Sequence, residues 1–322
     1  MPENPGLENA VLVAVGGNAL IRDGQQGTIA EQAENAAATA EHVATLVATG
    51  RRVLLTHGNG PQVGFILLRS ELARHHEFTP QLTLDMAVAD SEGGIGFILG
   101  RSLTNAMARR GMPDRVACLL TQTIVSAEDP AFAHPTKPIG RAYTPDEAAR
   151  HISEDGWVMV AETGRGLRRV VPSPHPLRIV ETEAVRALLA AGFAVIAGGG
   201  GGIPVVERSP GHYQGVEAVV DKDFASAMLA SSLGIPTLLL CTSVPRVAIR
   251  FGQPDQRWLD RLTPAEARSH LDQGEFPEGS MGPKIRAALE FIDRGGKEAI
   301  VTSQEYLEAS LTGNAGTHIV KD

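Results

Sequence analysis

The sequence predicts an α/β protein with a mainly parallel, open sheet that helices cover on both faces. Short apolar runs alternate along the chain with longer segments of helical periodicity, as is typical of βαβ units. Three of the apolar runs end in glycine-bearing turns: Val11–Val15, Val53–Thr56 and Phe193–Ala197. Because ligands bind outside the carboxyl ends of the strands in such sheets, we expect the three turns to share one site.

The first half of the chain alternates strands with helices. Thr28 and Glu31 form a capping-box pattern, so a helix is expected over Ile29–Thr49. Proline at a first helical position favours a second helix over Pro61–Arg74. Two further elements are expected, a helix over Gly94–Arg110 and a strand over Val116–Thr123.

The second half continues the alternation. A helix is expected over Glu181–Ala191, before the strand Phe193–Ala197, and another over Val216–Leu233, which Gly234 ends. The remaining expected elements are the strands Thr237–Cys241 and Val247–Phe251, the helices Pro264–Asp272 and Lys284–Asp293, and the strands Glu298–Thr302 and Thr317–Val320.

Residues 126–176 interrupt this pattern. The segment holds six prolines before His175, yet it also contains two short strand-like runs, Trp157–Val160 and Arg169–Val171. A segment with apolar runs of its own is expected to fold, so we interpret it as an inserted lid or protruding subdomain. The whole chain, 1–322, is expected to form one domain around that insertion.

The composition is that of a globular protein, with 322 residues and 43% hydrophobic side chains. A net charge of −8 argues against a general nucleic-acid-binding protein, which should be basic. The uncharged stretch Leu188–Val206 is not interpreted as a membrane span, because it contains six glycines and Pro204. Cys118 and Cys241 are expected to be buried, reduced thiols, and no signal peptide is visible, which favours a cytoplasmic protein.

The stretch Phe193–Leu229 combines features expected of a phosphate site. Gly198–Gly202 has no side chains to exclude a ligand, and its consecutive amides are expected to form an anion-binding concavity. Lys222 lies near the start of the next helix, where a cation is unfavourable unless an anion also binds there. Lys284 repeats this arrangement after a second glycine-containing turn. Two such lysines favour phosphate chemistry over solvated surface lysines.

Several neighbouring residues allow two interpretations. Asp221 or Asp223 can cap the helix, and Asp221 is a plausible N-cap; alternatively, one of the two carboxylates positions the lysines or accepts magnesium. Asn18 and Asn59 can bind a small planar substrate through an amide donor and acceptor, or can be turn residues with positive φ. His57 is interpreted as a loop histidine bonded to the backbone rather than as a base.

Two common nucleotide-binding motifs are absent from the sequence. The Gly296-Lys297 pair is followed by Glu298, so there is no G-x-x-x-x-G-K-[ST] phosphate loop. The pattern G-x-G-x-x-G fails at Ile203. A nucleotide site in this chain is therefore neither a P-loop nor an ordinary dinucleotide site.

Seven motifs, in order over nearly the whole chain, resemble those of the carbamate kinases within the amino acid kinase family. They are Ala14–Leu20, Thr56–Gly64, Lys137–Gly140, Arg169–Pro174, Ala197–Val205, Gly215–Asp223 and Gly279–Lys284. The resemblance implies a three-layer αβα sandwich, usually a homodimer, with a protruding subdomain over the site. It also implies phosphoryl transfer between ATP and carbamate, with magnesium, to give ADP and carbamoyl phosphate. The family suggests a reaction run toward ATP in arginine metabolism.

The resemblance further implies roles for individual residues. Lys137, Lys222 and Lys284 would neutralise charge on the transferred phosphoryl group, and Asp221 or Asp223 would orient the lysines. The phosphoryl group and the carbamate would contact Gly16, Gly17, Asn18, Gly58, Asn59 and Gly60. The nucleotide would contact Gly199, Gly200, Thr242, Ser243, Met281 and Pro283.

Three positions depart from the family pattern. Ser243 stands where aspartate is usual, Glu92 where glutamine is more typical, and Arg141 where proline is usual. Ser243 leaves nucleotide recognition open, and a carboxylate at Glu92 suggests a changed substrate. Two alternatives therefore remain: a kinase of the same fold that acts on a different small carboxylate, and a non-catalytic metabolite-binding regulator.

Overall fold

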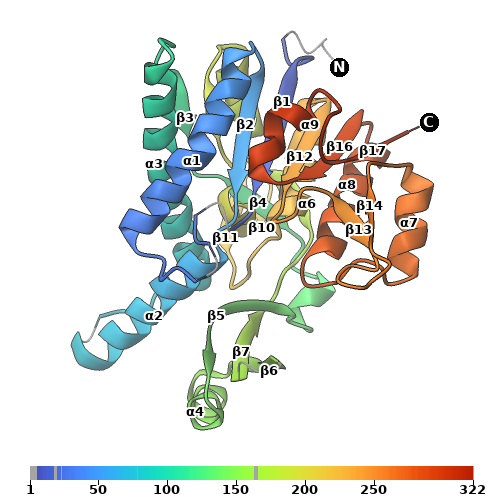
Figure 1. The fold of residues 1–322 in the computed structure, drawn as a ribbon. Coiled ribbons are helices and arrows are strands. Elements are labelled where there is room, and N and C mark those ends of the chain that lie inside the picture. The colour runs from blue at the N-terminus through green and yellow to red at the C-terminus, as the bar shows by residue number, and fades with distance from the viewer. Residues whose placement is uncertain (1–5, 18–19, 23, 78, 163–165, 322) are drawn as a thin grey trace.

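The computed structural model describes residues 6–17, 20–22, 24–77, 79–162 and 166–321 of the chain. Within these residues the largest sheet has eight strands. In order across the sheet (Figure 1), they are β15 (Arg261–Leu262), β17 (Thr317–Val320), β16 (Glu298–Thr302), β12 (Thr237–Cys241), β1 (Ala10–Val15), β2 (Arg52–His57), β9 (Ala194–Ile196) and β3 (Val116–Cys118). β16 and β17 pair antiparallel and the other neighbours pair in parallel, so the expected mainly parallel sheet is confirmed.

Helices cover both faces of this sheet. They are α1 (Ile29–Ala48), α3 (Leu84–Arg109), α5 (Thr182–Ala190), α6 (Lys222–Leu233) and α8 (Met281–Asp293). Val11 and Val13 of β1 belong to an apolar cluster that also contains residues of α1 and α3. The alternate residues Leu12 and Ala14 belong to a second cluster, with residues of α5, α6 and α8. The three-layer αβα arrangement is therefore confirmed, and burial on both faces explains why β1 is apolar throughout.

Smaller elements lie around these layers. A four-stranded sheet has the order β11 (His212–Gly215), β10 (Ile203–Ser209), β4 (Gln122–Val125) and β8 (Pro176–Ile179). The 3₁₀ turn η2 (Pro130–Phe132) lies within the insertion. The other elements are the 3₁₀ turns η3 (Gly199–Gly201) and η4 (Gln304–Tyr306), the hairpin of β13 (Val247–Ile249) and β14 (Arg257–Leu259), and the helices α2 (Gly60–Glu77), α7 (Pro264–Asp272) and α9 (Leu307–Ser310). None of the described helices is both long and apolar enough to span a membrane.

The strand expected over Val116–Thr123 is in fact two strands in two different sheets, β3 and β4. The amide of Leu119 still donates to the carbonyl oxygen of Ile196 in β9, at 2.9 Å. Thr121 then leaves the large sheet, because both its amide and its hydroxyl donate to the carboxylate of Glu92 in α3. A contact between residues distant in sequence therefore divides the apolar run.

Three other expected boundaries are wrong. α3 begins at Leu84 rather than Gly94, and its first turns are buried against the core, which outweighs the helix-weakening effect of its glycines. α6 begins at Lys222 rather than Val216, because the side chain of Asp221 caps it. β13 ends at Ile249, before the turn in which Arg250 has a φ of +51°.

The segment 126–176 contains a small antiparallel sheet of its own, in the order β5 (Lys137–Tyr143), β7 (Gly166–Val171) and β6 (Val158–Glu162). Figure 1 shows it with helix α4 (Pro145–Asp155) below the large sheet, at the carboxyl ends of the central strands. The predicted run Arg169–Val171 falls within β7, and Trp157–Val160 overlaps β6 but begins one residue before it. The sequence analysis did not predict α4, although Thr144 and Glu147 form a capping box at its start.

Candidate active site

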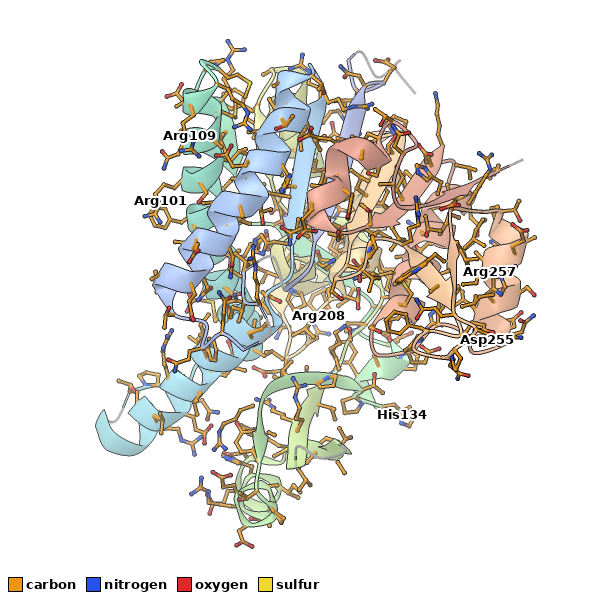
Figure 2. All side chains as sticks on the ribbon, viewed as in Figure 1. Arg101, Arg109, His134, Arg208, Asp255 and Arg257 are labelled. Carbon is orange, nitrogen blue, oxygen red and sulfur yellow. The ribbon has the colours of Figure 1, made fainter. Side chains whose placement is uncertain are left out.

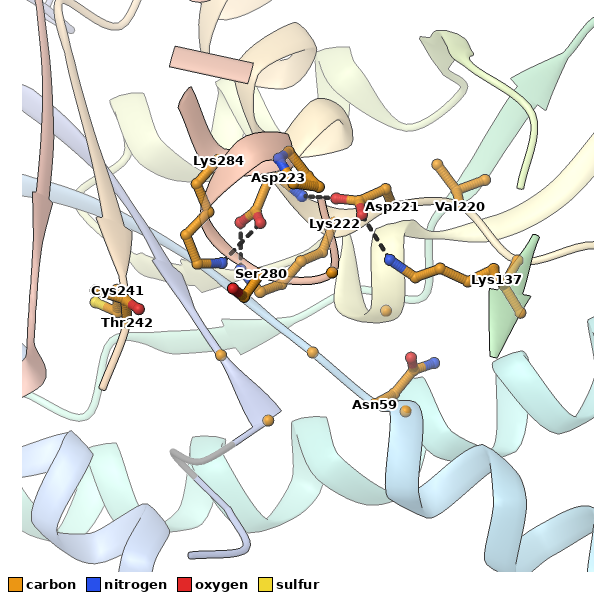
Figure 3. A pocket seen from close by; sticks show the side chains of 18 of the residues that line it. Asn59, Lys137, Val220, Asp221, Lys222, Asp223, Cys241, Thr242, Ser280 and Lys284 are labelled. Carbon is orange, nitrogen blue, oxygen red and sulfur yellow. Dashed lines mark hydrogen bonds and ion pairs between the residues drawn. The ribbon is translucent and has the colours of Figure 1, made fainter. Parts of the chain in front are cut away.

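A cavity of about 360 Å³ lies at the carboxyl ends of β1, β2 and β12, where the sequence predicted a shared site (Figure 3). It is lined by residues from turns that lie far apart in the chain. The predicted site residues among them are Gly16, Gly17, Gly58, Asn59, Gly60, Lys137, Gly200, Asp221, Lys222, Asp223, Thr242, Ser243, Pro283 and Lys284. Gly199 and Met281, two predicted nucleotide contacts, are not among the lining residues.

The turns after β1 and β2 approach each other closely on one side of the cavity. The amide of Gly58 donates to the carbonyl oxygen of Val15 at 3.0 Å, which extends the pairing of the two strands. A Cβ added to Gly58 would lie 3.1 Å from the backbone nitrogen of Gly17. Glycine therefore permits this close approach. Asn18, also predicted to contact substrate, lies outside the described residues, and its role stays a prediction.

Lysines and aspartates form a cluster on the opposite wall (Figure 3). The carboxylate of Asp223 lies between two ammonium groups: it accepts a hydrogen bond from Lys222 and a second, of 2.8 Å, from Lys284. All three side chains are at most 14% exposed. The start of α6 thus brings together a buried group of two cations and one anion, with Lys284 contributed by α8.

Asp221 performs both of the tasks that the sequence left open. Its Oδ1 accepts a 2.9 Å hydrogen bond from the amide of Asp223, which caps α6. Its Oδ2 accepts a 2.7 Å hydrogen bond from Lys137, the first residue of β5. Asp223, in contrast, pairs with lysines and does not cap the helix.

The electrostatics of the cluster suit an anionic ligand. Burial acts to raise the pKa of Asp223, but Lys222 and Lys284 outweigh it and hold that pKa well below its usual range. Burial lowers the pKa of Lys222, although Asp223 opposes the effect. Burial also acts to lower the pKa of Lys284, but the contact with Asp223 outweighs it and raises that pKa. Three lysines thus face two aspartates, and the excess positive charge remains for a phosphate group to balance.

The glycine turn (Gly198–Gly202) does not form the predicted anion-binding concavity. The amide of Gly198 donates to Oγ1 of Thr121, and that of Gly199 to the carboxylate of Glu92. The amides of Gly201 and Gly202 donate to carbonyl oxygens within the turn, at 3.1 and 3.0 Å. These four amides therefore already have partners inside the protein, and the positive charge at the cavity belongs to the lysines.

Within the glycine turn, Gly200 reaches the cavity and Gly199 does not. A Cβ added to Gly200 would lie 2.0 Å from Nδ2 of Asn59, so glycine is required where the two parts of the wall meet. A Cβ added to Gly199 would lie 2.4 Å from Nε2 of His57. Gly199 therefore lies behind the wall of the cavity, which does not favour the predicted nucleotide contact.

His57 is bonded to the backbone, as the sequence analysis interpreted it. Its Nδ1 donates to the carbonyl oxygen of Gly58 at 3.1 Å. Burial lowers the pKa of His57 to about 4, so the ring is neutral near pH 7. Cys241 is buried as expected, at the cavity, and burial raises the pKa of its thiol to about 12. Cys118 is exposed, contrary to expectation, because it ends the edge strand β3.

The sequence analysis missed two polar residues of the cavity, Ser280 and Gln304. Ser280 directly precedes α8 and lies inside the Gly279–Lys284 motif, of which only Met281, Pro283 and Lys284 were predicted as site residues. Gln304 follows β16, and its Oε1 accepts a 2.5 Å hydrogen bond from Thr39 in α1. Its place after the carboxyl end of a central strand was the signal that could have identified it.

Of the three departures from the family pattern, only Ser243 lies at the cavity. Glu92 is buried behind the glycine turn. Arg141 stacks over Tyr143, with 4.1 Å from its Cζ to the ring centre, and pairs with Glu147 at 2.8 Å. The carboxylate of Glu92 therefore does not face a bound anion, which removes the reason for expecting a changed substrate there.

Comparison with known proteins places the chain in a family. The sequence profile of the amino acid kinase family matches residues 9–303. The carbamate kinase-like protein YahI of Escherichia coli is 46% identical over 98% of this chain and 100% of its own length. The carbamate kinase of Thermococcus kodakarensis is 42% identical over 97% of this chain and 99% of its own length.

Solved structures agree with these sequence comparisons. The structure of carbamate kinase from Giardia lamblia bound to AMP-PNP superposes with a TM-score of 0.91 at 37% identity, covering 99% of this chain and 100% of that chain. The similarity spans the large sheet, the insertion and the turns of the cavity together. The chain therefore belongs to the amino acid kinase family, on its carbamate kinase branch.

Proposed function

We propose that the protein is a carbamate kinase, which transfers a phosphoryl group between ATP and carbamate to form ADP and carbamoyl phosphate. The observation that carries the proposal is the buried group of Lys222, Asp223 and Lys284. It leaves an excess positive charge opposite the paired turns that contain Gly17 and Gly58. Relatives named carbamate kinase, matched over nearly their whole length, support the choice of substrate.

The proposed chemistry needs positioning and charge rather than a protein nucleophile. An oxygen of carbamate forms the new bond to the γ-phosphorus of ATP, while the bond from that phosphorus to the bridging oxygen of ADP breaks. Lys222 and Lys284 neutralise the negative charge that accompanies this transfer, and Lys137 approaches from the insertion. Because carbamate is already an anion, no general base is required, which agrees with the neutral, backbone-bonded His57.

The two halves of the cavity suggest where each substrate binds. The turns after β1 and β2, with Gly16, Gly17, Gly58, Asn59 and Gly60, are assigned to carbamate and the transferred phosphoryl group. Thr242, Ser243 and Pro283, on the side of β12 and α8, are assigned to the nucleotide. The lysine cluster lies between the two, beside the phosphorus that is transferred.

Magnesium fits this site as part of the nucleotide complex. The described residues contain no group of three or more His, Cys, Asp or Glu side chains arranged to hold a metal ion. The two carboxylates of the cavity, Asp221 and Asp223, are paired with lysines. The phosphate oxygens of ATP and water would therefore provide most of the ligands of a magnesium ion, as is common for this ion. The bound ion would neutralise part of the phosphate charge.

The reaction is proposed to run toward ATP, at the end of arginine or purine-derivative breakdown in the cytoplasm. Carbamoyl phosphate is a mixed anhydride of a carboxylic and a phosphoric acid, and such acyl phosphates transfer their phosphoryl group to ADP with a favourable free energy. Supply of carbamoyl phosphate by an upstream reaction would therefore favour ATP formation in this site.

The test is ATP formation from ADP, magnesium and carbamoyl phosphate, measured for the wild type and for Lys222→Ala. Lys297→Ala is the matched control, because Lys297 is exposed and lies outside the cavity. We expect turnover in the wild type and control, with a loss of at least 100-fold in Lys222→Ala. A folded wild type that binds ADP without turnover would contradict the proposal. Acetate and other small carboxylates, tested with ATP, would then distinguish a different kinase from a non-catalytic regulator.

The protein is further proposed to be a homodimer that uses the outer face of α3. Met86 and Phe97 are exposed on α3, at 49% and 64%, and the exposed Leu120 packs against Gly93 of the same helix. Arg101, which points outward from α3 in Figure 2, lies over the ring of Phe97 at 5.1 Å. An exposed apolar row with an arginine beside it is typical of an interface. Light scattering should give a dimer mass for the wild type and a monomer mass for Phe97→Glu, and a monomeric wild type would exclude this interface.

A further inference from the structure

A buried carboxylate lies behind the cavity and contacts the glycine turn from the protein interior. Glu92 of α3 is 1% exposed. Its Oε1 accepts hydrogen bonds from the hydroxyl of Thr121, at 2.6 Å, and from the amide of Gly199, at 3.0 Å. Its Oε2 accepts from the amide of Thr121 at 3.2 Å. Three donors therefore converge on one carboxylate, and none of them belongs to the cavity surface.

Thr121 connects this carboxylate to a second amide of the turn. Its Oγ1 donates to Glu92 and accepts a 2.9 Å hydrogen bond from the amide of Gly198. At the other end of the turn, the hydroxyl of Thr123 donates to the carbonyl oxygen of Gly201 at 2.7 Å. The turn is thus bonded on both sides of Gly200.

The position of Gly200 determines the space available to Asn59. The backbone of Gly200, with a φ of +65°, passes so close that an added Cβ would lie 2.0 Å from Nδ2 of Asn59. That Nδ2 donates to the hydroxyl of Ser91 at 2.8 Å. Two consecutive residues of α3, Ser91 and Glu92, therefore hold two adjoining parts of the cavity wall.

We propose that Glu92 is a positioning residue for phosphoryl transfer: its carboxylate, together with Thr121, holds the glycine turn where Gly200 and Asn59 shape the substrate side of the cavity. Glu92 touches no substrate in this arrangement and acts through the turn. The inference rests on the proposed function for its catalytic readout, but the hydrogen bonds themselves can be tested without any substrate.

In this chain, the two acceptor oxygens of the carboxylate match the three donors that surround Glu92. A glutamine at position 92 has one acceptor oxygen and a donating NH₂ group. In place of Oε2, that NH₂ group would face the amide of Thr121, which is also a donor. The same mismatch arises when the carboxyl group is protonated, so the position of the turn is expected to change with pH.

The groups around Glu92 favour a proton uptake within the working range of pH. Burial raises the pKa of Glu92 to about 7, against the opposing hydrogen bonds from Thr121 and Gly199, and Glu181 adds to the increase. His57, on β2, is neutral at this pH and gives no compensating positive charge. Cys118 of β3 is an exposed residue, but its sulfur lies close to Gly96 of α3. Desolvation there, and secondarily Glu92, raises the pKa of the thiol to about 11, so it is also uncharged.

The experiment compares wild type and Glu92→Gln in ATP formation between pH 5.5 and 9. In the wild type, we expect kcat/KM for carbamoyl phosphate to change with pH, with a midpoint near pH 7 (the pH limb). This pH dependence should be absent in Glu92→Gln. The KM for carbamoyl phosphate should rise about tenfold at pH 8 in the variant, with the KM for ADP unchanged. The reason is that the donor–donor contact at residue 92 weakens its hydrogen bonding to the glycine turn, which displaces Gly200 and Asn59 on the carbamoyl phosphate side of the cavity. Glu181→Gln is the control: Glu181 accepts a 2.7 Å hydrogen bond from the backbone of Gln122. Its variant should keep the pH dependence, displaced to lower pH because the charge of Glu181 helps to raise the pKa of Glu92.

Hydrogen exchange provides a readout that does not depend on the proposed activity. The Gly198 and Gly199 amides should exchange slowly in the wild type at pH 8 and at least tenfold faster in Glu92→Gln and in Thr121→Val. Thr121→Ser keeps the hydroxyl group, so its amides should exchange as slowly as those of the wild type. Unchanged exchange, or an unchanged pH limb and KM in a folded Glu92→Gln, would overturn the proposal. Faster exchange in an enzyme that does not use carbamoyl phosphate would support the positioning role while rejecting the proposed substrate.

Discussion

Lys137 and Asp221 are joined by a 2.7 Å hydrogen bond although 84 residues separate them in the chain. Lys137 begins β5 of the insertion, and Asp221 caps the helix that carries Lys222 and Asp223. The same carboxylate thus fixes the start of α6 and the inner end of the insertion. This contact couples the position of the insertion to the charge cluster of the cavity.

Replacing Lys137 by methionine should lower kcat by about 100-fold, because an ammonium group beside the transferred phosphoryl is lost while most of the side-chain volume is kept. Steady-state kinetics of ATP formation provide the measurement, with Lys297→Met as the control. A kcat within threefold of the wild type would show that Lys137 has only a structural contact with Asp221.

Gly64→Ala should displace β5. A Cβ at Gly64 would lie 2.6 Å from Cα of Gly140, and backbone cannot move aside as a flexible side chain does. We expect kcat to fall at least tenfold, since Lys137 lies three residues before Gly140 in the same strand. Gly100→Ala is the control: it makes the same substitution without a clash, because an added Cβ there lies 3.8 Å from Cδ1 of Ile196. Equal activity of the two variants would contradict this reasoning.

Asp223→Asn should destabilise the protein by about 3–5 kcal/mol, because Lys222 and Lys284 would lose their shared buried counter-ion. Urea denaturation monitored by circular dichroism measures this change, and Asn at the exposed Asp114 serves as control. Added ADP or phosphate should restore part of the lost stability by binding the folded state. A loss below 1 kcal/mol would mean that the two ammonium groups are well hydrated without Asp223.

Two buried neighbours should act on stability in opposite directions as pH changes. The pKa of Glu92 is raised from 4.5 to about 7, so its contribution is complete below pH 4.5 and is lost as pH rises to about 7. The pKa of His57 is lowered from 6.5 to about 4, so its contribution is complete above pH 6.5 and is lost as pH falls to about 4.

The prediction concerns the difference in unfolding free energy between wild type and Glu92→Gln. As pH rises from 4.5 to 7, the unfolding free energy of the wild type should fall by about 3 kcal/mol relative to that of Glu92→Gln. Urea titrations at a series of pH values measure it, and the control is Glu181→Gln. A difference independent of pH would show that Glu92 stays ionised throughout this range.

Arg250→Asn should increase stability by about 0.5–1 kcal/mol. Arg250 has a φ of +51°, a left-handed conformation that asparagine adopts at lower cost than arginine. The exposed ion pair with Asp255 would be lost, but such pairs contribute little. Thermal or urea unfolding measures the change. Arg257→Asn, in strand β14 of the same hairpin, is the control and should not stabilise the protein.

The sequence predicted those parts of the fold that depend on local patterns. β12 and β16 have the predicted boundaries, because buried parallel strands are continuous apolar runs between turn residues. The capping box of Thr28 gave the start of α1 for a similar reason, since both of its hydrogen bonds join residues of one turn. The meeting of the glycine turns at one edge followed from the direction of the strands alone.

The remaining features depend on contacts between distant residues, which no local pattern contains. The glycine turn was expected to present its amides to an anion, yet the amide of Gly199 donates to Glu92, 107 residues away. Glycine allows either orientation, so its presence could not distinguish them. The break between β3 and β4 has the same origin, because Thr121 contacts that carboxylate as well.

The place of β1 at the centre of the sheet has a consequence for the synthesis of the protein. β1 pairs with β2 on one side, but its other partner, β12, ends at Cys241. At typical translation rates, about 10–45 s pass between the appearance of the two strands. During that interval the nascent chain carries an apolar strand with one open edge, which is a site for pairing with other chains. The nascent chain, rather than the folded protein, is therefore the form in which this edge of β1 is open to other chains.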